Sequence, residues 1–173
     1  MDRSKNEDQI TSFLDVFELL FKDKKGDFIP YCATGLTYAA ALAYQEFWNP
    51  SAPSTKIASP RESLPELDRY HFYPTPSVRD MYNVALGKRR WLDAGNRSKL
   101  PTPKPGYVII YAFGANPDHC GIVESVSGQT LTTIEFNTSN GLAGDQRNGG
   151  MVARRTRPYS ASVKGFIATD TKA

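Results

Sequence analysis

The chain has 173 residues, of which 40% are hydrophobic, which is enough for one core and predicts a single domain, residues 1–173. It has 21 Lys and Arg against 18 Asp and Glu, and the formal charge of +3 favours anionic surroundings without indicating nucleic acid. Two cysteines are too few for a disulfide framework.

The N-terminal segment MDRSKNEDQITSF has charges of both signs, and Asp15, Glu18 and Lys22 interrupt the apolar residues that follow. This pattern predicts neither a secretory signal nor a membrane span, so we expect a soluble protein made in the cytoplasm. Apolar residues recur at intervals of three and four from Ile10 to Phe21. They predict an amphipathic helix that ends before Gly26.

Cys32 opens a second predicted helix, over residues 32–48, whose alanine-rich stripe allows close packing and should be buried. Residues 49–76 contain six prolines and predict an ordered excursion, part of a longer unmatched region at about 49–100. A third helix is predicted from Thr75-Pro76 to Gly87. The cations Lys88, Arg89 and Arg90 suit the negative end of its dipole, and we interpret them as a solvated helix end.

Beyond Pro105 the sequence changes to short runs of β-branched and aromatic residues, separated by turn residues such as Ser127-Gly128, Asn140-Gly141 and Asn148-Gly149-Gly150. Helices followed by strands predict an α+β domain with a five-stranded antiparallel sheet. The predicted strands are Tyr107–Phe113, Gly121–Val126, Thr130–Asn137, Met151–Thr156 and Val163–Ala168.

The candidate catalytic residues are Cys32, His119, Glu135 and Asn137. A helix N-terminus and a nearby imidazole both lower the pKa of a thiol, which is the condition for a cysteine nucleophile. His119 begins a predicted strand and is the favoured base, whereas His71 lies in the proline-rich excursion. Glu135 and Asn137 share one face of the next strand, where either could orient the imidazole.

The length of the loop around Gly128 decides whether His119 lies on that same face. A two-residue loop in a regular hairpin would place it on the opposite face, so we predict a three-residue loop with Gly128 in the left-handed conformation. Each of these residues alone has an ordinary structural explanation, and their order along the chain is what indicates a papain-like cysteine hydrolase. A zinc site would require both cysteines and both histidines to converge, and we expect neither a metal nor a cofactor.

Several segments resemble the CHAP family of cysteine, histidine-dependent amidohydrolases and peptidases, relatives of the NlpC-type cell-wall peptidases. The resemblance covers Tyr31–Leu42 and Lys104–Ile167, and it is most specific from His119 to Asn137. The segments are YCA at the start of the alanine-rich helix, PKPGYVIIY, HCGIVESVSGQTLTTIEFNTS, GGMVARRTRP and VKGFI.

The resemblance implies a papain-like fold, with N-terminal helices packed on the sheet, and hydrolysis of an amide bond in bacterial peptidoglycan without a metal. Cys32 matches the nucleophile of the family, His119 its base and Glu135 its His-orienting residue, with Asn137 able to share or take that last role. The backbone N–H of Cys32 would stabilise the oxyanion.

Three positions depart from the pattern of the family. Tyr31 stands where Trp is common and should still line the cleft, and Tyr107 replaces an acidic residue. Cys120 replaces an aliphatic residue, and we expect its side chain to point away from His119 into the core without a disulfide to Cys32. Besides Tyr31, the candidate substrate-binding residues are His71 and Tyr73, in an aromatic run that lines a groove or anchors the excursion.

These expectations lead to a peptidoglycan amidase or endopeptidase, a monomer that acts at the cell wall or in a target periplasm after injection, non-classical export or lysis. It would be an antibacterial secreted effector with a cognate immunity protein as partner, or a phage lysin. One alternative is a papain-like hydrolase or acyl transferase that acts on a non-wall protein. Another is a non-catalytic binding module that uses Arg154, Arg155 and the run from Lys88 to Arg90, although adjacent strand residues face opposite sides.

Overall fold

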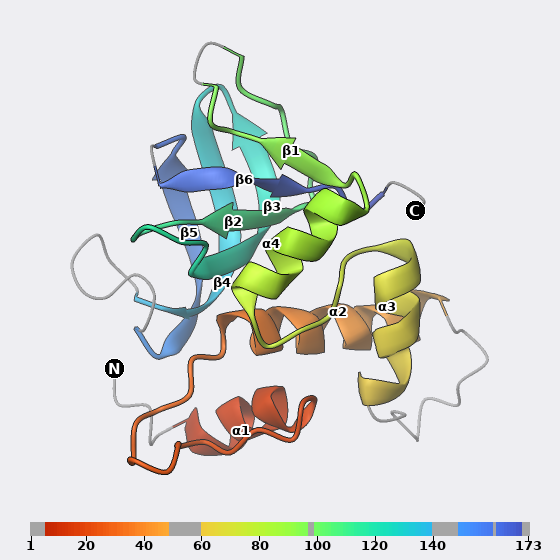
Figure 1. The fold of residues 1–173 in the computed structure, drawn as a ribbon, viewed down its shortest axis with the longest axis vertical. Helices are drawn as coiled ribbons and strands as arrows, with labels where there is room; N and C mark the ends of the chain where they lie inside the picture. The colour runs from red at the N-terminus through yellow and green to blue at the C-terminus, as the bar shows by residue number, and fades with distance from the viewer. Residues whose placement is uncertain (1–5, 49–59, 97–98, 140–148, 161, 171–173) are drawn as a thin grey trace.

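The computed structural model describes residues 6–48, 60–96, 99–139, 149–160 and 162–170. Within them, α-helices pack on one antiparallel sheet of six strands in the order β1-β6-β2-β3-β4-β5 (Figure 1). The α+β class is confirmed, but the sheet has one strand more than predicted. The strands are β1 Trp91–Asp93, β2 Val108–Tyr111, β3 His119–Ser127, β4 Thr130–Thr138, β5 Met151–Pro158 and β6 Val163–Ile167.

The additional strand, β1, lies within the region of residues 49–100 that the sequence left without a strand, and it pairs with β6 at one edge of the sheet. Part of that region, residues 49–59 and 97–98, lies outside the described residues, as does the turn predicted at Asn140-Gly141. The helices of the described residues are α1 Glu7–Asp15, α2 Cys32–Trp48, α3 Leu64–Tyr70 and α4 Val78–Gly87, with a short 3₁₀ turn, η2 Pro60–Ser63. None of them combines the length and the apolar character needed to cross a membrane.

Helix α1 is shorter than predicted. The apolar period continues to Phe21, but the helix ends at Asp15, and Glu18 takes a left-handed φ of 57°. The N–H groups of Phe17 and Leu19 both bond to the Leu14 carbonyl and close the helix end. The predicted continuation to Phe21 is therefore wrong. The chain leaves the helix at a left-handed residue that is a glutamate, whereas a helix end of this kind usually has a glycine.

The interpretation of Lys88–Arg90 as a solvated helix end is wrong for Arg90. Its side chain is 2% exposed and donates to the carbonyls of Asp68 and Arg69, at 3.3 and 2.8 Å. Lys88 bonds to the Asp68 carboxylate at 2.6 Å. These cations satisfy carbonyls at the end of α3 and thereby join that helix to the end of α4.

The sheet is buried on both faces. Helices α2 and α4 lie against one face, and α1 packs on α2 (Figure 1). On this face the sheet contributes Val108, Ile110, Cys120, Phe136 and Ile167 to what we call the helix-side core. The opposite face forms a second core, to which the sheet contributes Ile109, Tyr111, Val123, Leu131, Val163 and Phe166. Alternate residues of β2 therefore enter alternate cores.

Helix α2 lies directly on β4 because Gly35 has no side chain. A Cβ at Gly35 would lie 2.4 Å from Cδ1 of Phe136, far closer than carbon atoms can approach. The predicted span of α2, from Cys32 to Trp48, is confirmed at both ends. This close packing fixes the N-terminus of α2, and with it Cys32, relative to the sheet.

The hairpin of β3 and β4 differs from the prediction in its loop. Ser127 pairs with Thr130, so the loop has two residues, although Gly128 has the predicted left-handed conformation with φ 58°. A β-bulge within β3, and not the loop, places His119 on the face of Glu135. The register shifts between Val123 and Ser125, so Glu124 is an extra residue in this strand. Upstream of the bulge, Gly121 pairs with Glu135, and His119 shares its face.

Candidate active site

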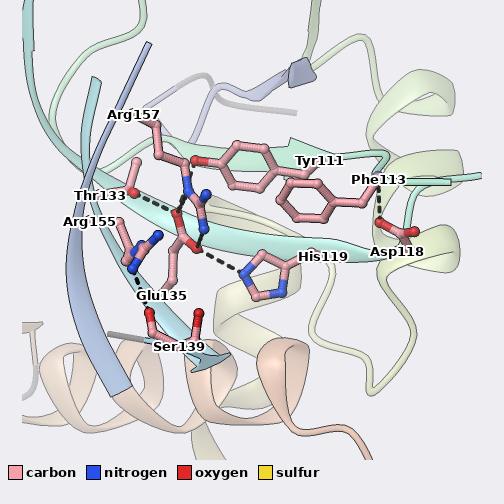
Figure 2. Close-up of polar contacts among 9 residues, drawn as sticks. All are labelled: Tyr111, Phe113, Asp118, His119, Thr133, Glu135, Ser139, Arg155 and Arg157. Carbon is pink, nitrogen blue, oxygen red and sulfur yellow. Dashed lines mark hydrogen bonds and ion pairs between the residues drawn. The ribbon is translucent and has the colours of Figure 1, made fainter. Parts of the chain in front are cut away.

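The centre of the site is a contact between the imidazole of His119 and the carboxylate of Glu135. Nε2 of His119 lies 3.0 Å from Oε2 of Glu135, and both side chains are fully buried. Figure 2 shows the two side chains pointing toward each other from β3 and β4. The sequence left open whether Glu135 or Asn137 orients the imidazole, and the structure shows the contact for Glu135.

Gly121 provides the space for this contact. It pairs with Glu135 across the hairpin, and a Cβ at this position would lie 2.8 Å from Cγ of Glu135 and 2.8 Å from the Ile134 carbonyl oxygen. The Glu135 side chain therefore passes over the glycine, on the face that also holds His119. A larger residue would push the carboxylate away from the imidazole.

Four side chains donate hydrogen bonds to the Glu135 carboxylate. Oε1 accepts from Tyr111 Oη at 3.1 Å, Thr133 Oγ1 at 2.8 Å and Arg157 Nε at 2.7 Å. Oε2 accepts from Arg157 Nη2 at 2.8 Å, in addition to the imidazole. Burial raises the pKa of the Glu135 carboxyl, but the bonds from Arg157 and then from His119 outweigh it and hold the pKa well below its usual range. Glu135 is thus ionised and fixed in orientation.

Aromatic rings surround the imidazole on the face of the second core. The rings of Tyr111 and Phe113 stack on each other and lie 5.8 and 5.9 Å from the His119 ring (Figure 2). The carboxylate of Asp118 accepts from the N–H groups of Phe113 and Gly114, both at 3.0 Å, and so closes the loop that leads into His119. The imidazole is therefore held on both its edge and its face.

Cys32 is the first residue of α2, where helical N–H groups are not used by the helix itself. It lies where this helix meets the start of β3, and its sulfur interacts with His119 and with Cys120. The first turn of α2 contains no acidic side chain that would oppose the positive end of the helix dipole. The arrangement favours the thiolate form of Cys32.

The pKa shifts of the pair agree with a thiolate and an imidazolium. Interaction with Cys120, and to a lesser degree with His119, lowers the pKa of Cys32 well below its ordinary value, although burial opposes the shift. Burial lowers the pKa of His119, but its interactions with Cys32 and Glu135 outweigh burial and raise the pKa to about 9. The two shifts have opposite directions, and both favour a proton on the imidazole over one on the thiol.

The two nitrogens of His119 have different roles. Nε2 faces Glu135, which as a carboxylate can only accept, so this nitrogen carries a proton. Nδ1 is buried and makes no hydrogen bond of good geometry within the described residues, which leaves it as the nitrogen available to Cys32. Its separation from the sulfur is thus looser than a formed hydrogen bond, as is common before substrate binds.

Cys120 lies in the helix-side core, as predicted, but it also interacts with Cys32, which the sequence did not indicate. Both cysteines are buried free thiols. Interaction with Cys32 and burial raise the pKa of Cys120 well above its ordinary value, so Cys120 stays protonated.

The remaining predicted residues lie apart from this contact. Asn137 is buried next to the site, with a left-handed φ of 57°, and its carbonyl accepts from the Gly149 N–H at 3.1 Å. Tyr31 is 1% exposed, with its ring 5.9 Å from that of Phe13, and lines a pocket of about 170 Å³ between α1 and β5. These two residues adjoin the catalytic candidates.

His71 and Tyr73 are not brought to Cys32. His71 lines a separate pocket of about 460 Å³ with Ala40, Ala43 and Tyr44, and its Nδ1 lies 3.1 Å from the Thr169 carbonyl. Ala40 is eight residues along α2 from Cys32, about 12 Å at the helical rise. Tyr73 is half-exposed, whereas Phe72 enters the helix-side core, so the aromatic run anchors the excursion.

Access to the site is restricted. His119 and Glu135 are fully buried, and Cys32 is 5% exposed. Among the residues that the structure describes, no three His, Cys, Asp or Glu side chains gather in a way that could bind a metal ion.

Sequence reasoning did not find Arg157, Tyr111, Thr133 or Gly121 as part of the site. The available signal was positional: Thr133 and Glu135 alternate on one strand face, and Gly121 and His119 alternate on its partner. Comparison of the chain with protein-family models, with curated proteins and with solved structures found no match.

Proposed function

We propose that the protein is a cysteine amidase or peptidase that hydrolyses an amide bond of bacterial peptidoglycan through a thioester, in the manner of the CHAP family and with a papain-like arrangement of helix and sheet. The observation that carries the proposal is the convergence of Cys32, at the N-terminus of α2, with a buried imidazole that Glu135 fixes at 3.0 Å.

In the first step, the thiolate of Cys32 attacks the amide carbonyl carbon and forms the C–S bond. The C–N bond then breaks as the imidazolium gives its proton to the leaving amine. In the second step, a water molecule gives a proton to the neutral imidazole and attacks the thioester. The C–S bond breaks, the acid is released, and the thiolate–imidazolium pair is restored.

The negative charge on the carbonyl oxygen needs donors during both steps. The backbone N–H of Cys32, at the start of a helix without acidic residues in its first turn, is suited to this role. Loss of one such donor usually costs about 2.7–4 kcal/mol of transition-state stabilisation.

The peptidoglycan substrate is supported by the resemblance of the segments that bear Cys32, His119 and Glu135 to CHAP enzymes. It is tested by digesting purified sacculi under reducing conditions and identifying new amino termini by mass spectrometry. We expect release by the wild type and none by Cys32→Ala or His119→Gln. The chain has two histidines, so His71→Gln is the matched control and should retain activity.

Absence of release by the folded, reduced wild type would contradict the wall substrate. If Cys32 then still alkylates as a thiolate at pH values below the ordinary cysteine pKa, about 8.5, the thiol enzyme remains and its substrate is an amide, ester or isopeptide outside the wall. Retained release by Cys32→Ala would contradict the mechanism itself.

A further inference from the structure

Strand β5 contains two arginines in bidentate ion pairs with very different surroundings. Arg154 bonds to Glu124 at 2.7 and 2.6 Å, with 67% and 38% of the side chains exposed. Arg157 bonds to Glu135 at 2.7 and 2.8 Å, with 11% and 0% exposed. The same chemistry thus occurs once at the surface, where it contributes little to stability, and once in the site.

The geometry of the buried pair restricts the orientation of the carboxylate. Nε and Nη2 of Arg157 each take one oxygen of Glu135, which fixes the carboxylate plane and aims Oε2 at His119 (Figure 2). The guanidinium carbon in turn lies 5.4 Å from the ring centre of Tyr111 and 5.6 Å from that of Phe113. These rings also contact the imidazole, so arginine and histidine share one aromatic support.

We infer that Arg157 is a positioning residue of the reaction: it sets the plane and the charge of Glu135 and thereby the orientation and proton affinity of the His119–Cys32 pair. The inference rests on the proposed function for its consequence in catalysis. Its effect on Cys32 does not depend on any substrate.

The sign of the effect follows from the charges around the site. Removing the cation of Arg157 leaves the Glu135 carboxylate buried without its principal partner. The site then has one positive charge less, so protonation becomes more favourable at its acidic groups, including the Cys32 thiol. The thiolate of Cys32 therefore forms at higher pH. The titratable and charged groups that face the pair are Tyr111 from β2, Cys120 from β3, Glu135 from β4, and Arg155 and Arg157 from β5.

The test uses three variants of the full chain: Arg157→Gln, Arg157→Lys and, as matched control, Arg154→Gln. The rate of Cys32 alkylation by iodoacetamide is measured against pH by mass spectrometry, with Cys32 and Cys120 distinguished by peptide, and thermal unfolding is followed in parallel. We expect Arg157→Gln to move the acidic limb of alkylation upward by about 1 pH unit or more. Arg154→Gln should leave it unchanged.

Arg157→Lys separates charge from geometry. It keeps the cation, so the alkylation limb should stay near that of the wild type. It loses the two-pronged contact, so the rate of release from sacculi should fall on the order of 10²-fold, the usual cost of about 1 Å of misplacement. If Arg157→Gln does not fold, this variant carries the test, and an unchanged rate overturns the inference.

A residue with only a structural role gives a different result. Arg157→Gln would then unfold at lower temperature, but its folded fraction would alkylate with the wild-type pH dependence, and that outcome overturns the inference. If the wild type releases nothing from sacculi while Arg157→Gln still shifts the alkylation limb, the proposed function fails and the link from Arg157 to the thiol stands.

Discussion

The glycine that faces Glu135 gives the sharpest test of the site geometry. In Gly121→Ala the new Cβ would lie 2.8 Å from Cγ of Glu135 and 2.8 Å from the Ile134 carbonyl oxygen. Carbon atoms are in favourable contact at about 3.5–4.0 Å, so the Glu135 side chain has to retreat by about 1 Å. The oxygen belongs to the backbone of β4 and cannot rotate away, so the hairpin also has to adjust.

Two magnitudes follow from this clash. Overpacking of a buried site usually costs about 1–3 kcal/mol in the free energy of unfolding, and each kcal/mol lowers Tm by about 2–4 °C for a chain of this size. A displacement of the carboxylate by about 1 Å should also lower the catalytic rate on the order of 10²-fold, a larger loss than the stability change explains.

The assay measures thermal unfolding and the rate of release from sacculi for Gly121→Ala and for Gly87→Ala. At Gly87 a Cβ meets no atom within 4 Å, so the control should keep both stability and rate. Equal Tm and equal rate for Gly121→Ala and the wild type would refute the view that this glycine makes room for the His119–Glu135 contact.

Three further outcomes are expected. The pKa of Cys32 is lowered and that of His119 is raised to about 9, so the rate of release should have two limbs. The rate should rise on the acid side as the thiolate forms, and it should fall as the pH passes about 9, where the imidazolium loses the proton that the leaving amine needs. A single rise near the ordinary cysteine pKa of about 8.5 would contradict this. Cys120→Ala removes the thiol whose interaction lowers the pKa of Cys32 and should shift the alkylation of Cys32 to higher pH. Cys120→Ser keeps a polar hydrogen at this position and should shift the alkylation less. Identical profiles for the two variants would count against the interaction. Arg90→Ala removes the side-chain donor of the Arg69 carbonyl, whereas the Asp68 carbonyl keeps Lys88 Nζ at 3.2 Å. The variant should lower the free energy of unfolding by about 1–3 kcal/mol in a urea titration. Arg79→Ala, on the exposed face of α4, should stay within about 0.5 kcal/mol of the wild type.

The parts of the fold that follow from local patterns could be predicted from the sequence. The span of α2, the position of α4 and the location of five strands all depend on periodicity and on turn residues within a few positions. The end of α1 could not be predicted, because the left-handed Glu18 responds to surroundings that the local sequence does not specify. Strand β1 has three residues, too few for a period to be visible.

The site shows the same division. Cys32 at a helix start, and His119 and Glu135 at alternating strand positions, could be proposed from the order of the residues. The role of Arg157 could not, because an arginine on an alternating strand normally indicates a solvent-facing residue, and its partner lies 22 positions away across the sheet. The contact of Cys120 with Cys32 likewise depends on how α2 lies on β3, which no single element determines.

The predicted three-residue loop between β3 and β4 is wrong, but the requirement from which it was predicted is met. The prediction required His119 and Glu135 to share a face, and they do, but Glu124 supplies the needed residue within the strand instead of within the loop. The alternation of side chains along a strand shows that the hairpin needs one extra residue for His119 and Glu135 to share a face. It does not show whether that residue lies in the loop or in a strand.

Strand β3 contains one residue, Glu124, that has no partner in β4, so this residue could be deleted without changing the other pairs. Removing Glu124 would leave Val123 opposite Thr133 and Ser125 opposite Thr132 as consecutive pairs, and the imidazole would still emerge beside the carboxylate. The hairpin could therefore be shortened by one residue while His119 and Glu135 keep the same face of the sheet. A second deletion in the same strand would turn the His119 side chain to the opposite face of the sheet, away from Glu135.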